Sequence, residues 1–320
     1  MKIVDMHCDT IMRMALSDGK ISLRENDGHI DIAKMQKGGA LAQFFAIFIP
    51  MMKMKEIYGE DSSYKYFNKA YEVYLSEMEK NKDFILPAFN YEDIMKNKEM
   101  GKMSSILTIE EGDPVQGKME RIKEFYDKGV RLITLTWNFE NCFGYPNSDD
   151  DSIMKKGLKE FGIEALAYMN ELGMLIDVSH LNEGGFYDVA KYSKKPFVAS
   201  HSCARNIASH KRNLWDEQLK LVGETGSVVG VNFSSSFLRD GSNFSTIDDV
   251  VKHMLHIKDK AGMEAVAWGS DFDGIAPTLE WVDYAGMPKL EEALSKHFTP
   301  REIDMINHEN ALRVIKASMK

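Results

Sequence analysis

The sequence of 320 residues predicts an α/β fold, a (β/α)8 or TIM barrel with extra helices. Eight short apolar, β-branched runs alternate with longer helical patterns, as expected for parallel strands that are buried on both faces and joined by helical crossovers. No Gly-x-Gly-x-x-Gly or Walker pattern stands at a strand–helix junction, which disfavours a nucleotide-binding open sheet. Because barrels of this length commonly form one domain, we expect residues 1–320 to be a single barrel domain.

The expected strands recur along the whole chain, and helical patterns fill the stretches between them. The strand runs are 2–8, 40–49, 104–111, 130–137, 173–180, 195–201, 226–233 and 264–271. The clearest helical stretches are 116–128, 158–172, 182–192 and 247–261.

Two segments are additions to a plain barrel. Residues 59–81 predict an inserted helix with an aromatic stripe at three- and four-residue steps, which indicates core packing or a subunit interface and permits a homodimer. The stripe consists of Tyr64, Phe67, Tyr71, Tyr74 and Met78. Residues 138–157 are polar, contain Gly and Pro, and predict a long active-site loop.

Composition narrows the class of protein. A net charge of −9 and a pI near 5.6 argue against a nucleic-acid partner. The three cysteines, Cys8, Cys142 and Cys203, show no zinc-ribbon spacing and fit a reducing compartment. The N-terminus shows no secretory signal, and no run reaches the roughly 18 to 20 apolar residues of a membrane helix. We therefore expect a cytoplasmic protein without a membrane partner.

Polar residues stand where the expected strands end. In the stretch IVDMHCDT, His7 and Asp9 are two residues apart, so an extended chain points both to one face. Other strand runs end in a histidine or a carboxylate. These residues are Glu111, His180, His201 and Asp271. Because active sites of this fold gather at the C-terminal ends of the strands, we expect all six side chains to meet there.

Imidazoles and carboxylates without a thiolate suit two divalent ions such as zinc, which lie about 3.5–4 Å apart in such sites. Glu111 is the expected bridge, because its two oxygens can each bind one ion. His7 and Asp9 would complete one metal site, and His180 with His201 the other. A hydroxide between the ions would attack an amide, and Asp271 would orient it and carry its proton to the leaving amine.

The same residues resemble one family, the membrane (renal-type) dipeptidases, peptidase family M19 of the amidohydrolase superfamily, whose members are metal-dependent hydrolases with a TIM barrel. This chain looks like a bacterial-type member without an anchor. The matching segments are HCDT (7–10), GGALAQFF (38–45), EEGD (110–113), YDKGVRLITLT (126–136), GLKEFGIEALAYMNELGMLIDVSH (157–180), PFVASHSCARNIASHKRN (196–213), WGSDFDGI (268–275) and NHENALRVI (307–315).

The resemblance implies the same five metal ligands and Asp271 as the strand-eight aspartate, which also contacts the substrate. It further implies that Arg212 binds the carboxylate of a dipeptide, a task that suits a guanidinium. One position departs from the family. Trp137 stands where vertebrate members have a histidine that holds the scissile carbonyl oxygen, so Asn138, Asn141 or the second zinc would have to replace it.

These observations predict a binuclear zinc dipeptidase that hydrolyses free L-Xaa-L-Xaa dipeptides and, as the family suggests, L-Xaa-D-Xaa dipeptides. One alternative keeps the two metals but acts on another small amide or a lactam. The His-x-Asp pair and the glutamate bridge disfavour this alternative. Hydrolases that act on such amides and lactams often use a His-x-His pair on strand one and a carboxylated lysine as the bridge. A second alternative is a non-catalytic binding protein that keeps the barrel. Loss of catalysis would normally delete a metal ligand or the strand-eight aspartate, and all six residues are present in this sequence.

Overall fold

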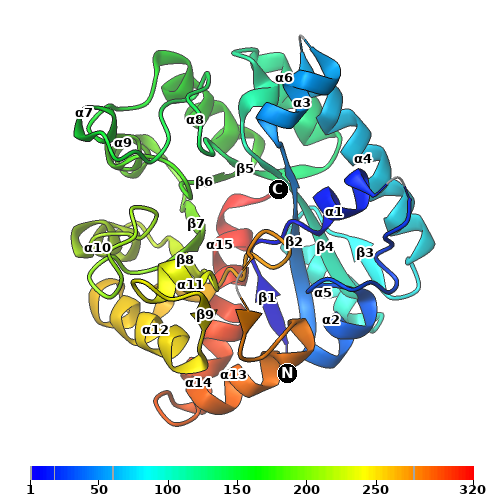
Figure 1. Cartoon of the computed structure of the whole chain (residues 1–320), viewed down its shortest axis with the longest axis vertical. Helices are drawn as coiled ribbons and strands as arrows, with labels where there is room; N and C mark the ends of the chain where they lie inside the picture. Colours follow the sequence, from blue (N-terminus) through cyan, green and yellow to red (C-terminus); the bar gives the residue numbers. More distant parts are fainter. Residues whose placement is uncertain (1, 18, 60, 277) are drawn as a thin grey trace.

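Eight parallel strands close into a barrel in the computed structural model, which describes residues 2–17, 19–59, 61–276 and 278–320 (Figure 1). Around the barrel the order is β2-β1-β10-β8-β7-β6-β5-β4, and β4 closes it by pairing with β2. The strands are β1 Ile3–Asp5, β2 Ala40–Phe48, β4 Met103–Glu110, β5 Val130–Thr134, β6 Leu175–Asp177, β7 Val198–Ser202, β8 Val228–Val231 and β10 Val266–Trp268. The predicted (β/α)8 barrel is confirmed, and each expected run overlaps one of these strands.

Three short strands are additions to the barrel. β3 (Ile85–Pro87) pairs with the first residues of β4. β9 (Phe244–Ser245) and β11 (Thr278–Leu279) pair in parallel as a separate sheet, and so join the segment after β8 to the segment after β10.

Helices surround the barrel (Figure 1) and pack against the outward side chains of the strands. They are α1 Thr10–Leu16, α2 Ile32–Gly38, α3 Met51–Tyr58, α4 Ser62–Lys80, α5 Tyr91–Glu99, α6 Met119–Asp127, α7 Asp151–Met154, α8 Glu160–Leu172, α9 Glu183–Tyr192, α10 Asp216–Glu224, α11 Ser235–Leu238, α12 Ile247–Ala261, α13 Met287–Leu294, α14 Pro300–Asp304 and α15 Asn310–Ser318. The four stretches expected to be helical correspond to α6, α8, α9 and α12.

Local sequence sets where these helices begin and end. The side chain of Asn182 accepts a hydrogen bond from the backbone N–H of Gly185 at the start of α9, and Thr246 caps α12 in the same way. α8 ends at Gly173, whose φ of 85° lies in the left-handed region that glycine adopts without a steric penalty. These caps give partners to backbone groups that the end of a helix leaves without an intrahelical hydrogen bond.

The lower half of the barrel interior is apolar and is sealed by α15. Inward side chains of the strands form one buried cluster with five residues of the C-terminal segment. The strand residues are Val4, Ala42, Phe44, Ile106, Leu132, Leu175, Val198, Val228 and Ala267, and the C-terminal ones are Ala311, Leu312, Val314, Ile315 and Met319. Because this end is closed by packing, polar groups can reach the barrel axis only from the opposite, C-terminal end of the strands.

The predicted helix at 59–81 is α4, which begins at Ser62; residue 60 lies outside the described residues. Phe67, Tyr74 and Met78 of its aromatic stripe are buried in the core, and Tyr64 and Tyr71 pack against the core at its edge. This packing accounts for the stripe within one chain, so the expected homodimer stays a prediction.

Within the part of the chain that the structure describes, no helix combines the length and the apolar character needed to cross a bilayer. The cytoplasmic location inferred from the sequence stays a prediction.

Truncating Ile315, one of the side chains that α15 packs into the apolar cluster of the barrel, should destabilise the protein. Ile315→Ala removes a side chain that is 1% exposed and leaves a cavity, which we expect to lower the free energy of unfolding by about 2–5 kcal/mol. Ala317→Ser, on the exposed face of the same helix, should change it by less than about 0.5 kcal/mol. Urea unfolding at 25 °C measures both variants, and equal stabilities would contradict the packing of α15 in the barrel.

Candidate metal centre and substrate pocket

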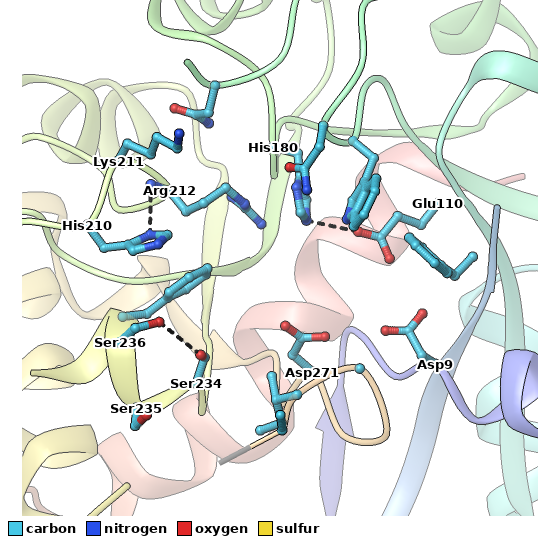
Figure 2. Close-up of a pocket in the computed structure, with 18 of the residues that line it drawn as sticks. Asp9, Glu110, His180, His210, Lys211, Arg212, Ser234, Ser235, Ser236 and Asp271 are labelled. Atoms are coloured by element: carbon cyan, nitrogen blue, oxygen red, sulfur yellow. Dashed lines mark hydrogen bonds and ion pairs between the residues drawn. The ribbon is translucent and has the colours of Figure 1, made fainter. Parts of the chain in front are cut away.

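A cavity of about 830 Å³ opens at the C-terminal ends of the strands (Figure 2). Histidine and carboxylate side chains lie at its inner end, and Arg212 points toward them from the segment that follows β7. Serine residues 234–236, from the start of α11, line the side of the cavity next to Arg212. The cavity therefore has an acidic and imidazole-rich end and a cationic, hydroxyl-rich end.

Glu110 is the centre of the inner end. Its Oε1 lies 2.9 Å from His180 Nε2 and 3.5 Å from His201 Nε2, and its Oε2 lies 3.1 Å from His7 Nε2. The two Nε2 atoms of His180 and His201 are 3.1 Å apart. Each carboxylate oxygen of Glu110 thus faces a different set of imidazole nitrogens, which is the arrangement needed to bridge two cations.

The structure corrects the expected position of the bridging residue, because Glu111 does not reach the histidines. Residues 106, 108 and 110 share the inward face of β4, so Glu111 points the other way. Its Oε2 accepts hydrogen bonds from the backbone N–H of Trp137, at 3.0 Å, and from Asn141 Nδ2, at 3.1 Å. Burial raises the pKa of Glu111 to about 8. Glu111 holds the segment after β5, and Glu110 is the glutamate that faces the three histidines.

His7 also faces a second group of oxygens. Its Nε2 lies 3.6 Å from Asp9 Oδ2 and 4.0 Å from Asp271 Oδ1, and these ligand atoms all lie close enough to share one ion. The side chain of Asn232 donates to Asp271 Oδ2 at 2.8 Å, which leaves Oδ1 facing the cavity. Two sets of donors, joined by His7 and Glu110, therefore converge at the inner end.

Two of these residues adopt backbone conformations that are rare for side chains other than glycine. His180 has a φ of 68° and Asp271 a φ of 60°, both in the left-handed region, and such strain concentrates at functional sites. Gly274 is held close to the same carboxylates. An added Cβ there would lie 2.0 Å from Asp9 Oδ2 and 2.5 Å from Asp271 Oδ1, so a larger residue would displace these carboxylates.

The electrostatics of the inner end fit bound cations. Burial, together with the charge of Glu110, raises the pKa of Asp9 to about 6, and burial raises that of Asp271 to about 8. Burial and the nearby Arg212 lower the pKa of His180 to about 3, so its imidazole is neutral. Burial opposes a charge on His7, but the charges of Glu110 and Asp9 outweigh it and raise the pKa of His7 well above its usual range. A bound divalent cation would take over the role of this imidazolium and relieve the repulsion between the carboxylates.

The surroundings of His7 support the same conclusion. Its side chain is fully buried, and its Nε2 lies 3.1 Å from Glu110 Oε2, 3.6 Å from Asp9 Oδ2 and 4.0 Å from Asp271 Oδ1. A divalent cation bound among these oxygens would replace the proton of the imidazole and pair with the same carboxylates. The residues present therefore fit a metal centre.

Arg212 lies in the cavity wall with much of its hydrogen-bonding capacity unused. It is 5% exposed, its Nη2 donates to the carbonyl oxygen of His201 at 3.4 Å, and its Nε has no partner in the described chain. Burial lowers its pKa to about 10, so it remains a cation at neutral pH. A buried guanidinium that faces a cavity is suited to an anionic group of a ligand.

The structure distinguishes Trp137, which stands at the position of the family histidine, from Asn138 and Asn141, the two side chains expected to replace that histidine. Trp137 lines the cavity, with its ring 4.8 Å from that of Phe48 and 6.1 Å from that of His180. Asn138 also lines the cavity. Asn141 does not fit the expected contact with the substrate, because its Nδ2 donates to Glu111 and to the carbonyl oxygen of Leu135.

The family model for membrane dipeptidases (Peptidase family M19) matches residues 1–320 of this chain. The chain belongs to the membrane dipeptidase family. An uncharacterized dipeptidase of Schizosaccharomyces pombe is 34% identical over 295 residues, which cover 86% of this chain and 69% of the yeast protein. An uncharacterized protein from the region 5' of pqqA in Klebsiella pneumoniae is 37% identical over 234 residues, covering 70% of this chain and 85% of that protein.

Solved structures of family M19 have the same fold. Dipeptidase AC, a metallopeptidase, superposes with a TM-score of 0.91 at 26% identity and covers 100% of this chain and 99% of its own. A metallopeptidase from Rhodobacter sphaeroides, bound to a phosphinate mimic of the dipeptide L-Ala-D-Ala, gives a TM-score of 0.91 at 25% identity and covers 99% of both chains. The protein is a hydrolase, a dipeptidase of the M19 metallopeptidases, and this family implies a divalent metal.

The two adjacent glutamates of this dipeptidase should differ in their effect on metal binding. Glu110→Gln removes a charged oxygen that faces the histidines, and we expect the divalent metal bound per chain to fall by at least half. Glu111→Gln, the matched control, leaves those oxygens in place and should keep the metal content unchanged. Plasma mass spectrometry of the purified variants measures the difference; the reverse result would return the expected ligand role to Glu111.

Proposed function

We propose that this chain is a binuclear zinc dipeptidase that hydrolyses the peptide bond of free L-Xaa-L-Xaa and L-Xaa-D-Xaa dipeptides. The observation that supports it best is the position of Glu110, whose two oxygens face different imidazole groups. One ion would be held by His7, Asp9 and Glu110, and the other by Glu110, His180 and His201. Zinc suits this donor set because imidazole and carboxylate groups are its ordinary ligands where no thiolate is present.

Two divalent ions held by these residues would supply an activated water and polarise the carbonyl oxygen of the substrate. Asp271 is the residue of the chain that would move the proton. Asn232 occupies its Oδ2, so Oδ1 is the oxygen that takes a proton from the attacking water. When the C–N bond breaks, the same oxygen returns that proton to the nitrogen of the leaving amine. Asn138 is an amide of this wall that can contact the carbonyl end of the substrate.

Arg212 would restrict the substrate to two residues. If the scissile carbonyl of a dipeptide lies at the inner end of the cavity, its one free carboxylate follows on the adjacent residue and would face the guanidinium of Arg212. Bidentate, charge-assisted hydrogen bonds are strong and directional, and a longer peptide would present an uncharged amide at that distance. The selection for dipeptides would therefore follow from one buried cation in the wall of the cavity.

The cavity wall near Arg212 includes the small side chains of Ser234 and Ser236 beside the larger His210 and Phe237, and the serines leave space for either configuration of the second residue. The Rhodobacter sphaeroides relative was solved with a mimic of L-Ala-D-Ala. We therefore extend the proposed substrates to those with a D-residue at the second position.

Metal analysis combined with a substrate panel tests the function directly. The protein is purified without a metal-binding tag, its zinc is measured, and it is offered L,L, L,D and D,L dipeptides and an N-acetylated dipeptide. We expect about two zinc ions per chain and cleavage of the L,L and L,D dipeptides, with loss of activity on chelation and recovery with zinc.

Other outcomes would contradict parts of this proposal. Two ions without cleavage of any dipeptide would redirect the search to another small amide and to the effect of Trp137 on the pocket. A protein that binds no metal after reconstitution would contradict the metal centre itself.

Replacing Arg212 should lower the activity on substrates that carry a free carboxylate more than the activity on substrates that lack one. For Arg212→Met we expect kcat/KM on a free dipeptide to fall by about 100-fold or more, since a buried charge pair is lost, and metal content to stay unchanged. The same substitution should have little effect on the corresponding dipeptide amide, which has no carboxylate. Arg205→Met is the control, because Arg205 lies on the same segment but pairs with Glu183 instead of lining the main cavity. Equal losses on the dipeptide and its amide would refute the proposed contact.

A further inference from the structure

His201 differs from the other two histidines in the partner of its second ring nitrogen. The Nδ1 atoms of His7 and His180 are buried and have no hydrogen-bond partner within the described residues. The Nδ1 of His201 lies 2.8 Å from the hydroxyl oxygen of Ser200. The structure thus constrains the ring of His201 through a neighbour that the sequence did not single out.

Ser200 is in turn held by a buried carboxylate. Asp177, at the end of β6, is fully buried, and its Oδ2 accepts hydrogen bonds at 2.6 Å from the hydroxyls of both Ser200 and Thr134. Its Oδ1 accepts from the backbone N–H groups of Ser179, at 3.0 Å, and Ser200, at 2.9 Å. Both oxygens of Asp177 thus accept two hydrogen bonds each, and the carboxylate acts only as an acceptor.

These contacts fix the position of one proton. A serine hydroxyl has a single hydrogen, and that of Ser200 is donated to Asp177, so Ser200 can only accept from the imidazole. The hydrogen of His201 therefore sits on Nδ1, and its Nε2 presents a lone pair toward Glu110 and His180.

We propose that Asp177 is a positioning residue that sets the tautomer of His201 through Ser200. This inference rests on the proposed function in one respect, because only the metal-ligand role of His201 makes the tautomer matter. A histidine binds a metal ion through an unprotonated nitrogen, and groups that hold the opposite N–H commonly fix which nitrogen is free. Asp177 would thus act on the metal centre without touching it.

Asp177→Asn should reverse the arrangement. The amide oxygen can keep the two backbone N–H groups, but the amide nitrogen then faces the hydroxyl of Ser200 as a donor. Ser200 would accept from Asn and turn its own hydrogen toward His201 Nδ1. The imidazole would have to carry its proton on Nε2, the atom that faces Glu110, and would present no lone pair there.

Asp5 offers a matched control for the loss of a buried carboxylate. It is also fully buried, and it accepts at 2.8 Å and 2.6 Å from the backbone N–H and the hydroxyl of Ser270. The further contacts of that hydroxyl are to backbone atoms of His7 and Phe272, and not to an imidazole ring. Asp5→Asn therefore carries a similar structural penalty without the predicted change at His201.

The test combines two measurements on the full chain. Proton–nitrogen correlation spectra of metal-free protein labelled with ¹⁵N-histidine report which ring nitrogen is protonated, and His201→Asn assigns the signal. We expect an Nδ1–H form of His201 in the wild-type protein and in Asp5→Asn, and an Nε2–H form in Asp177→Asn. Zinc competition titrations should then show one of the two ions bound about 10- to 100-fold more weakly in Asp177→Asn.

Each result decides a separate question. An Nε2–H form in the wild-type protein, or an unchanged tautomer in Asp177→Asn, would overturn the inference. A reversed tautomer with unchanged zinc affinity would support the role of Asp177 but refute His201 as a metal ligand in the proposed function. If Asp177→Asn does not fold, Ser200→Ala replaces it, since loss of the accepting hydroxyl should abolish the fixed Nδ1–H form, and persistence of that form would overturn the inference.

Discussion

The site depends on one buried carboxylate, Glu110, that lies among three imidazoles near the axis of the barrel. Placing a charge there is costly unless other groups compensate it. Burial acts to raise the pKa of Glu110, but the charge of His7 and a hydrogen bond from His180 oppose it, and the pKa lies well below its usual range. The apolar layer sealed by α15 and the ring of polar strand ends both serve to keep this charge at one position, dry on one side and open to the cavity on the other.

The groups around the centre are held in place by amide and hydroxyl side chains, and two of the hydroxyls are themselves held by buried carboxylates. Asn232 holds one oxygen of Asp271, and Ser270 joins Asp5 to the segment that carries Asp271. On the other side Ser200 joins Asp177 to His201. Ser200 directly precedes His201, and Ser270 directly precedes Asp271. The same arrangement, a serine that donates to a buried carboxylate next to a residue of the site, thus occurs at two places of the barrel. Directional hydrogen bonds of this kind fix a ligand's orientation more precisely than packing alone.

The barrel and the identity of the strand-end residues could be predicted from the sequence because each depends on local patterns. Apolar runs mark the strands, and a histidine or carboxylate at the end of each run marks the C-terminal face. The choice between Glu110 and Glu111 could not be made in this way. β4 is buried on both faces, so its sequence lacks the alternation that would reveal which glutamate points inward.

Asn141 shows a second limit of sequence reasoning. A polar residue in the segment after β5 is as well suited to hold a neighbouring carboxylate as to hold a substrate, and only the three-dimensional arrangement distinguishes the two. The supporting residues Asp177, Ser200 and Asn232 were missed for a related reason. Their partners lie on neighbouring strands, 23 residues apart in sequence for Asp177 and Ser200 and 39 for Asn232 and Asp271. A motif of contiguous residues does not contain such contacts.

The small parallel sheet of β9 and β11 links two segments with different duties. One of them carries Ser234 and Ser236 beside the cationic end of the cavity, and the other carries Asp271 and Gly274 beside the carboxylates. A displacement of either segment is therefore transmitted to the other through backbone hydrogen bonds. Attempts to exchange one of these loops for that of a relative, in order to alter substrate preference, would have to transplant both as a unit.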